Sequence, residues 1–240
     1  MGLSPYAQVR VLRSLADNAF CLTRAGVVAM IHKATEGTSY IDPNRATNIN
    51  RAMQAGIACC TYHWLSPGNA AEQMAHYTKT IDPVPGERMV IDYEEDGCTL
   101  SDLKEAVQAL LDDPRGLQVT VYSGHLLKEQ LGDKYDGYLA ETTDLWLAQY
   151  TSGEPSWPDG TYPTWTLWQY SETGEIDGID DAHVDLNRFN GSDRELVDWI
   201  NPAGRAPQPK SDQVSIDITV PDNVELKISI NGNPLVIGDR

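Results

Sequence analysis

The sequence lacks several features that would place it in a broad class of protein. Its 240 residues contain no apolar run long enough to cross a bilayer. Residues 1–10 lack the basic segment followed by an apolar stretch that is typical of a secretory signal. Lys and Arg number 18 against 35 Asp and Glu, a net charge of −17. Sustained phosphate contact needs many cations, so we do not expect nucleic acid or a membrane as a partner, and we assign the acidity to solubility.

Cysteine and metal-binding patterns are also scarce. The cysteines form no Cys-x-x-Cys pair and are Cys21, Cys59, Cys60 and Cys98. We therefore expect buried free thiols, which are compatible with a reducing cytoplasm. The histidines form no His-Glu-x-x-His pattern, and no glycine-rich phosphate loop is evident. The histidines are interpreted as structural, with His63 the one that most merits a test because it follows Tyr62 at a strand end.

Short apolar runs alternate with segments of helical spacing up to about residue 131. The apolar spacing predicts a first helix over residues 6–26, and Asp42-Pro43 predicts the start of another that ends at Gly56. Further helices are predicted at 69–81 and 100–111, with a short one through Leu126 and Leu131, and strands at 27–31, 57–62, 89–93 and 117–122. This alternation indicates a parallel sheet covered by helices.

The alternation of predicted strands and helices changes after Tyr138. Strands are predicted at 145–150, 166–170 and 184–186, separated by segments rich in Gly, Pro and Trp, before a closing helix at 194–200 that Ser192 could cap. The whole pattern predicts an α/β fold over residues 1–201: an irregular TIM-like barrel whose last part has lost its helices.

The C-terminal part of the chain has a different character. Residues 202–212 contain three prolines and little that is apolar, which predicts a linker. Apolar and polar residues then alternate over 214–220 and 224–230, with a turn at Asn231-Gly232 and a third short strand at 235–237. We expect a small β appendage over residues 213–240. Such strands are marginal alone, so they need the barrel, another subunit or a ligand as a partner.

The stretch 88–98 ends a buried strand in carboxylates. Asp92 and Glu94 stand at i and i+2, so a strand would point both side chains to one face, with backbones roughly 6.6 Å apart. Two carboxyl groups at this spacing can divide acid and base roles. The alternative is that both residues are only solvated at the start of a loop.

Other chemistry-bearing residues stand at the C-terminal ends of predicted strands, where parallel barrels gather their catalytic groups. Acids, amides and aromatic rings suit a carbohydrate, because sugar faces stack on rings and hydroxyls need donors and acceptors. Trp146, Trp165 and Trp168 are either sugar platforms or core residues. The strand-end residues are Lys33, Glu36, Tyr62, His63, Asp92, Glu94, Tyr122, Tyr150, Gln169, Tyr170, Asp185 and Asn187.

An ordered series of motifs across residues 24–190 resembles glycoside hydrolase family 25. The motifs are Lys33–Pro43, Asn50–Gly56, Tyr62–Trp64, Asp92–Glu94, Leu145–Tyr150, Trp168–Ser171, Gly178-Ile179 and Val184–Phe189. The resemblance implies a barrel of five βα units and three further strands. It also implies an N-acetylmuramidase that cleaves the β-1,4 bond between N-acetylmuramic acid and N-acetylglucosamine in peptidoglycan, with no metal or cofactor.

The resemblance also implies roles for individual residues. Glu94 would be the general acid, and Asp92 would orient the 2-acetamido group that acts as internal nucleophile in a substrate-assisted retaining route. Asp185 would be a further carboxylate that tunes the site. The substrate-binding residues would be Lys33, Glu36, Tyr62, Tyr122, Tyr150 and Gln169.

One departure from the family pattern leaves alternatives open. The family opens with a strand that ends in Asp, whereas Gly2 stands at that position here and the first strand is nearly absent. Either the chain begins late or it has lost an acid of the site. We predict a phage- or prophage-type endolysin that accumulates in the host cytoplasm and acts on the cell wall. The alternatives are a barrel that binds peptidoglycan without cutting it and a phage structural component. The 213–240 appendage would serve wall binding or self-association into a homo-oligomer.

Overall fold

The computed structural model describes residues 7–11, 25–175, 184–201, 229–230 and 233–234. The chain divides into two compact units, residues 1–209 and 210–240. In the second unit, β10 (Ser229–Ile230) pairs antiparallel with β11 (Asn233–Pro234), on either side of the predicted turn at 231–232. The strands predicted at 214–220 and 235–237, and the linker predicted at 202–212, lie outside the described residues.

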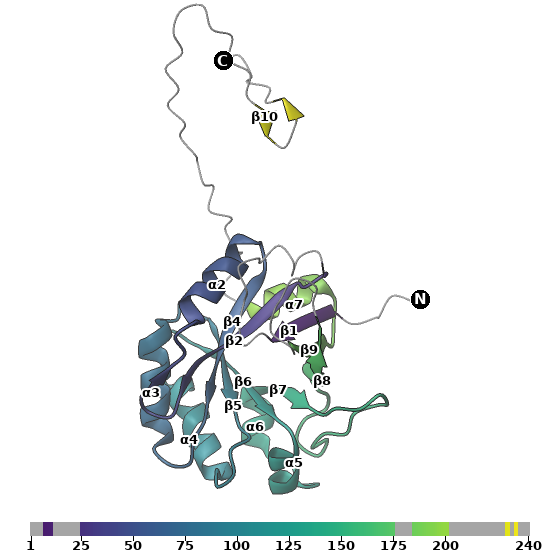
Figure 1. The fold of residues 1–240 in the computed structure, drawn as a ribbon. Helices are drawn as coiled ribbons and strands as arrows, with labels where there is room; N and C mark the ends of the chain where they lie inside the picture. Colours follow the sequence, from purple (N-terminus) through teal and green to yellow (C-terminus); the bar gives the residue numbers. More distant parts are fainter. Residues whose placement is uncertain (1–6, 12–24, 176–183, 202–228, 231–232, 235–240) are drawn as a thin grey trace, which may run out of the picture. The chain divides into compact units, whose positions relative to one another are not determined.

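Eight strands among the described residues of the first unit form a closed ring (Figure 1). The ring closes because β1 pairs parallel with β2 and antiparallel with β9. All the other pairs in the ring are parallel except β8 with β9, and the short β3 (Tyr40–Ile41) extends the edge of β2. The ring strands are β1 (Ala7–Val11), β2 (Ala29–Glu36), β4 (Ala58–Trp64), β5 (Arg88–Asp92), β6 (Gln118–Ser123), β7 (Thr143–Ala148), β8 (Leu167–Gly174) and β9 (Val184–Phe189).

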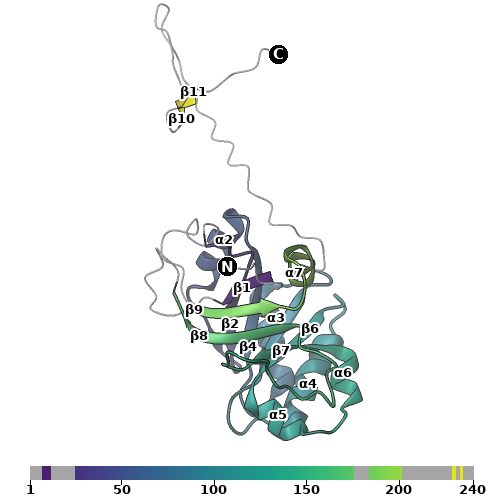
Figure 2. The same ribbon diagram turned by 90° about the vertical axis from the view of Figure 1, so that its right-hand side faces the viewer.

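Among the described residues a helix follows each of β2, β4, β5, β6 and β9, but none follows β7 or β8. In Figure 2, β8 and β9 face the viewer with no helix in front of them. This confirms the irregular TIM-like barrel. The strands β1, β2, β4, β5 and β6 begin the five predicted βα units, although residues 12–24 after β1 lie outside the described part. The helices are α2 (Arg45–Gln54), α3 (Ala70–Ile81), α4 (Leu100–Leu111), α5 (His125–Leu131), α6 (Gly137–Thr142) and α7 (Asp193–Ile200).

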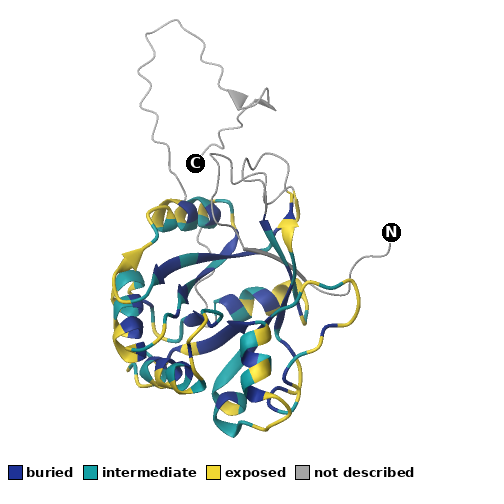
Figure 3. Ribbon diagram, turned by 60° about the horizontal axis from the view of Figure 1, so that its bottom comes forward, coloured by how far each residue is buried: buried dark blue, intermediate teal, exposed yellow. Residues whose placement is uncertain are grey.

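The strand β5 shows how the pleat divides the core into two layers. Met89 and Ile91 pack outward in the cluster that holds α3 and α4, whereas Val90 packs inside the barrel. Figure 3 shows these buried strands at the centre, with most exposed residues on the outer faces of helices, in loops and on strand ends such as β3. Leu196 and Ile200 of α7 belong to the inner cluster, so α7 closes the end of the barrel at which β5 begins.

The N-terminal prediction was wrong in one respect. The helix expected over residues 6–26 is a strand at Ala7–Val11, and the first strand is therefore present. Backbone hydrogen bonds to two neighbouring strands are available at this gap in the ring, and they outweigh the weak preference that apolar spacing expresses. Gly2 lies outside the described residues and precedes this strand, so it does not stand at the strand's C-terminal end. The strand itself contains no acidic residue.

Smaller differences concern helix ends. The helix expected from Asp42 begins at Arg45, because the Asp42 carboxylate accepts the Asn44 N–H at 2.8 Å in a turn that precedes the helix. The α4 prediction is confirmed at both ends. The predicted cap of α7 is also confirmed, with Ser192 accepting the Glu195 N–H. The helix α6 was not predicted.

Three of the four cysteines are described, and all three are free. Cys60 and Cys98 are buried, which confirms the expectation for these two, whereas Cys59 is free but only half-buried, and Cys21 lies outside the described residues. Within the part of the chain that the structure describes, no helix combines the length and apolar character needed to span a membrane.

Candidate active site

The backbone that follows β5 continues the alternation of the strand. The Tyr93 N–H donates to the Tyr122 carbonyl at 2.8 Å, and the Ser123 hydroxyl donates to the Tyr93 carbonyl at 2.6 Å. The Tyr93 side chain is fully buried on the outer side, where its hydroxyl donates to Gln130 Oε1 at 2.6 Å. With Tyr93 turned outward, Asp92 and Glu94 both face the mouth of the barrel.

These two carboxylates line one pocket with most of the predicted residues. The pocket has a volume of about 170 Å³ and lies at the C-terminal ends of the parallel strands. It brings together the three predicted catalytic residues and four of the six predicted substrate-binding residues. Its lining is Tyr62, Trp64, Asp92, Glu94, Tyr122, Trp146, Tyr150, Gln169, Glu172 and Asp185.

Aromatic rings form a fixed wall of this pocket. Tyr122 and Trp146 pack edge to face, with ring centroids 4.6 Å apart. The Trp146 indole N–H donates to Asn187 Oδ1 at 2.8 Å, and Asn187 is fully buried. Since Tyr122 and Asn187 hold the Trp146 ring on two sides, the wall is preorganised for a sugar face.

The pocket is strongly acidic. Asp92, Glu94, Glu172 and Asp185 line it, and none of its described lining residues is Lys, Arg or His. Burial and the neighbouring charges of Glu94 and Asp92 raise the pKa of Tyr122 well above its usual value.

A second tyrosine, Tyr150, also lies near carboxylates of the pocket. Partial burial, followed by the charges of Glu172 and Asp185, raises the pKa of Tyr150 to about 12. The hydroxyls of Tyr122 and Tyr150 therefore keep their protons and can donate hydrogen bonds inside the pocket.

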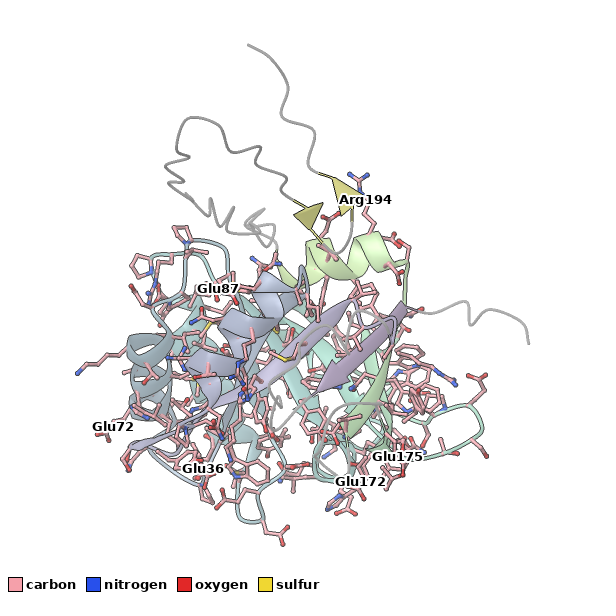
Figure 4. All side chains as sticks on the ribbon, turned by 45° about the horizontal axis from the view of Figure 1, so that its top comes forward. Glu36, Glu72, Glu87, Glu172, Glu175 and Arg194 are labelled. Carbon is pink, nitrogen blue, oxygen red and sulfur yellow. The ribbon has the colours of Figure 1, made fainter. Side chains whose placement is uncertain are left out.

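Lys33 and Glu36 are the two predicted residues that do not line the pocket. Their side chains form an ion pair with Nζ and Oε2 2.5 Å apart. The Lys33 ammonium lies 5.1 Å from the centroid of the Trp64 ring, so the pair contacts the pocket through Trp64. In Figure 4, Glu36 and Glu172 lie toward the same end of the barrel, and Glu87, which precedes β5, lies toward the other.

His63 belongs to the core and not to the pocket. It is fully buried, its Nδ1 lies 2.8 Å from Thr35 Oγ1, and its Nε2 lies 3.1 Å from Gln73 Oε1. Burial lowers the pKa of His63 to about 4, so the ring is neutral. Trp165 and Trp168 are also buried, which identifies both as core residues.

Trp64 and Glu172 line the pocket but were absent from the predicted site, and Trp146, which the sequence left open as a sugar platform or a core residue, lines it too. Trp64 directly follows the predicted Tyr62-His63 strand end, and its indole N–H donates to Glu95 Oε2 at 2.7 Å. Glu172 was missed because β8 runs to Gly174, four residues past its predicted end at Tyr170. Simple alternation from Gln169 would have placed Glu172 on the opposite face of the strand, because the two residues are three positions apart.

No metal centre is indicated in the described ranges. The described residues contain no group of three or more His, Cys, Asp or Glu side chains that could hold a metal ion. The expectation that the chemistry needs no cofactor remains a prediction.

Known proteins resemble this chain in sequence and in fold. The sequence profile described as "Glycosyl hydrolases family 25" matches residues 17–179, well over half of the chain. The uncharacterized protein YegX of Escherichia coli K12 is 30% identical over 181 residues, covering 73% of this chain and 64% of its own length. Lysozyme M1 of Streptomyces globisporus is 29% identical over 197 residues, covering 74% and 65%. The chain thus spans just under two thirds of these relatives.

Two solved structures support the same assignment. The bacterial lysozyme of Streptomyces coelicolor superimposes with a TM-score of 0.71 at 25% identity, over 82% of this chain and 98% of its own. A family 25 glycosyl hydrolase of Bacillus anthracis has the same fold, with a TM-score of 0.67 at 20% identity over 82% and 95%. By its sequence, its barrel and its motifs in order, the chain belongs to glycosyl hydrolase family 25.

Proposed function

We propose that this protein is a peptidoglycan hydrolase. It cleaves the β-1,4 bond between N-acetylmuramic acid and N-acetylglucosamine, in the role of a phage- or prophage-type endolysin. The observation that carries the proposal is that Asp92 and Glu94 share one acidic, ring-lined pocket at the mouth of a family 25 barrel. The lysozymes among its relatives support the same reaction class.

In the proposed mechanism the two carboxylates have different tasks. Glu94, which is only half-buried, reaches the glycosidic oxygen and gives it a proton as the bond breaks. Asp92 is 5% exposed and is held at the end of β5, so it suits a fixed hydrogen-bond acceptor for the substrate's acetamido N–H. The acetamido oxygen then attacks the anomeric carbon, and water later opens this intermediate with overall retention of configuration.

The remaining carboxylates act on charge that develops in the transition state. Asp185 and Glu172 line the same pocket and bear negative charge opposite the sugar ring, which becomes positive as the leaving group departs. The protonated hydroxyls of Tyr122 and Tyr150 donate hydrogen bonds to these carboxylates or to substrate oxygens.

Glu94→Gln tests the assigned acid. The amide keeps the shape of the side chain but cannot deliver a proton, so release of reducing ends from purified peptidoglycan should fall by about 10²–10⁴-fold. Asp96→Asn is the matched control, since Asp96 is exposed in the same loop and should retain full activity. Wild-type turnover by Glu94→Gln would show that another residue is the acid.

One observation favours a second candidate, a barrel that binds glycan without cutting it. The strand β1 contains no acidic residue, whereas the family resemblance leads us to expect an Asp at its end. Mass spectrometry of the products separates the two candidates, because a binding module retains glycan and creates no new ends.

A further inference from the structure

A second cavity borders the acidic pocket. It has a volume of about 340 Å³ and is lined by Gly124, His125, Lys128, Gln149 and Tyr150 together with Glu94. Glu94 and Tyr150 line both cavities, so these two side chains form their common border. A substrate whose scissile bond lies at Glu94 can therefore extend a group into the second cavity.

The two cavities differ in charge. The acidic pocket carries four carboxylates, whereas Glu94 is the only carboxylate among the described residues that line the second cavity. The second cavity instead carries the Lys128 ammonium and the His125 ring. An anionic group placed in the first cavity would be repelled by the nearby carboxylates, because like charges at close range interact unfavourably at a protein surface. The second cavity is where an anion can lie.

Lys128 has capacity for such a group. Its Nζ donates to Ser156 Oγ at 2.9 Å, and it takes part in none of the ion pairs of the described residues. An ammonium has three donors, so this one hydrogen bond leaves two. By contrast, Lys33 and Lys104 are each paired with a carboxylate at 2.5 Å.

The surroundings of Lys128 are fixed in place. The Gln149 side-chain oxygen accepts the Ser156 N–H at 2.8 Å. This hydrogen bond joins two parts of the loop after β7 and holds the serine that Lys128 contacts. The Gln149 carbonyl in turn accepts the Trp168 indole N–H at 2.8 Å. Lys128 is half-buried between α5 and this loop, so its ammonium is held near the cavity and does not extend freely into solvent.

We propose that the second cavity binds a carboxylate of the peptide stem carried by N-acetylmuramic acid, with Lys128 as its ion-pair partner. The inference rests on the proposed function, since it takes peptidoglycan as the substrate. The sugar hydroxyls and acetamido groups of that polymer are neutral, and the peptide stem supplies the anionic groups. Lys128 is therefore a specificity-determining residue, and the enzyme prefers glycan whose stems retain their carboxylates.

The test compares soluble glycan strands in three forms: native, with the stem carboxylates converted to amides by carbodiimide and ammonia, and stripped of stems by an amidase. For the wild-type chain, kcat/KM should fall about tenfold from native to amidated strands, as expected for one charge-assisted contact. Lys128→Gln should lower kcat/KM on native strands to the amidated level and cleave both at the same rate. Lys128→Arg, which keeps the charge, should retain the preference, and Lys134→Gln, at an exposed lysine, should behave as wild type.

The outcomes separate this inference from the function on which it rests. Equal wild-type rates on native and amidated strands, with reducing ends released from both, would overturn the stem site and leave the hydrolase standing. A full rate on stripped strands, which keep only the lactyl carboxylate, would also overturn it by assigning the anion to that group. If no form yields reducing ends, the proposed function itself is wrong.

Discussion

Arg88, the first residue of β5, is a buried cation that attaches α7 to the barrel. Its guanidinium donates to Asp144 Oδ2 at 2.6 Å, Thr120 Oγ1 at 2.8 Å and the Trp199 carbonyl at 2.6 Å. It also lies 4.2 Å from the centroid of the Trp199 ring. Asp144 accepts the Trp199 indole N–H at 2.8 Å, so β5, β6, β7 and α7 meet at this one group.

Arg88→Met removes all of these contacts and keeps the apolar stem. The lost hydrogen bonds are worth about 1 kcal/mol each to the neutral acceptors and about 2 to the carboxylate, and the contact with the Trp199 ring adds about 1. Part of this lost free energy is recovered for two reasons. The folded state no longer has to desolvate a guanidinium, and water can reach the Asp144 side chain, which is 39% exposed. We expect a net loss of about 3 kcal/mol in the free energy of unfolding. For a unit of this size that lowers Tm by roughly 6–12 °C.

Urea denaturation followed by tryptophan fluorescence measures this change. The control is Arg194→Met, whose side chain is 91% exposed and lies 3.9 Å from Asp198 Oδ2, so it should cost less than about 0.5 kcal/mol. Because Arg88 and the acidic pocket lie at opposite ends of β5, turnover at 25 °C should be unchanged. If Arg88→Met unfolds within about 1 kcal/mol of wild type, this network does not hold α7 in place.

Two further predictions concern a buried histidine of the core and a carboxylate that holds one wall of the site. Burial lowers the pKa of His63 to about 4 from about 6.5 in the unfolded chain, so the unfolded state binds more protons between these values. The free energy of unfolding should therefore fall by about 3 kcal/mol as pH is lowered from 6.5 to 4. Urea titrations should show that His63→Gln loses this component and that His76→Gln keeps it; an unchanged slope in His63→Gln would contradict the assignment. Glu95 accepts hydrogen bonds from Trp64 Nε1 at 2.7 Å and Ser66 Oγ at 2.9 Å. Glu95→Gln should accordingly raise KM about three- to tenfold with kcat unchanged, and a fall in kcat alone would show that Glu95 acts on the chemistry.

The sequence was sufficient to place Asp92 and Glu94 together. A fully buried strand has a strict period of two, and Val90, Asp92 and Glu94 follow it without interruption. The same rule failed for Lys33 because the register between β2 and β4 shifts between Lys33 and Thr35. A bulge of this kind redirects a side chain and has no reliable signature in a single sequence.

Irregular strand pairing also explains why Glu172 was missed. The pairing of β8 with β9 shifts after Gln169 and again after Ser171, so the strand continues past the point at which its simple alternation ends. For β1 a usable signal was present. Gln8, Val9, Arg10 and Val11 alternate polar and apolar residues, which favours a strand, but the longer apolar spacing over residues 6–26 outweighed it. Only the closed ring, with unpaired edges on β2 and β9, requires the strand.

The placement of charge at the mouth of the barrel connects the two proposed sites. Cations near the acidic pocket are engaged elsewhere: Lys33 pairs with Glu36, and the Arg188 guanidinium lies 4.6 Å from the centroid of the Tyr170 ring. The donors that face the described lining of the pocket are instead neutral phenols, whose pKa values burial and the nearby carboxylates raise. A neutral sugar ring can satisfy such donors and acceptors at little electrostatic cost, whereas an anionic group cannot enter without a counter-charge. Lys128, on the other side of Glu94, supplies that charge, and in the complex that we propose the neutral sugar ring lies at Glu94 and the anionic stem lies beside the lysine.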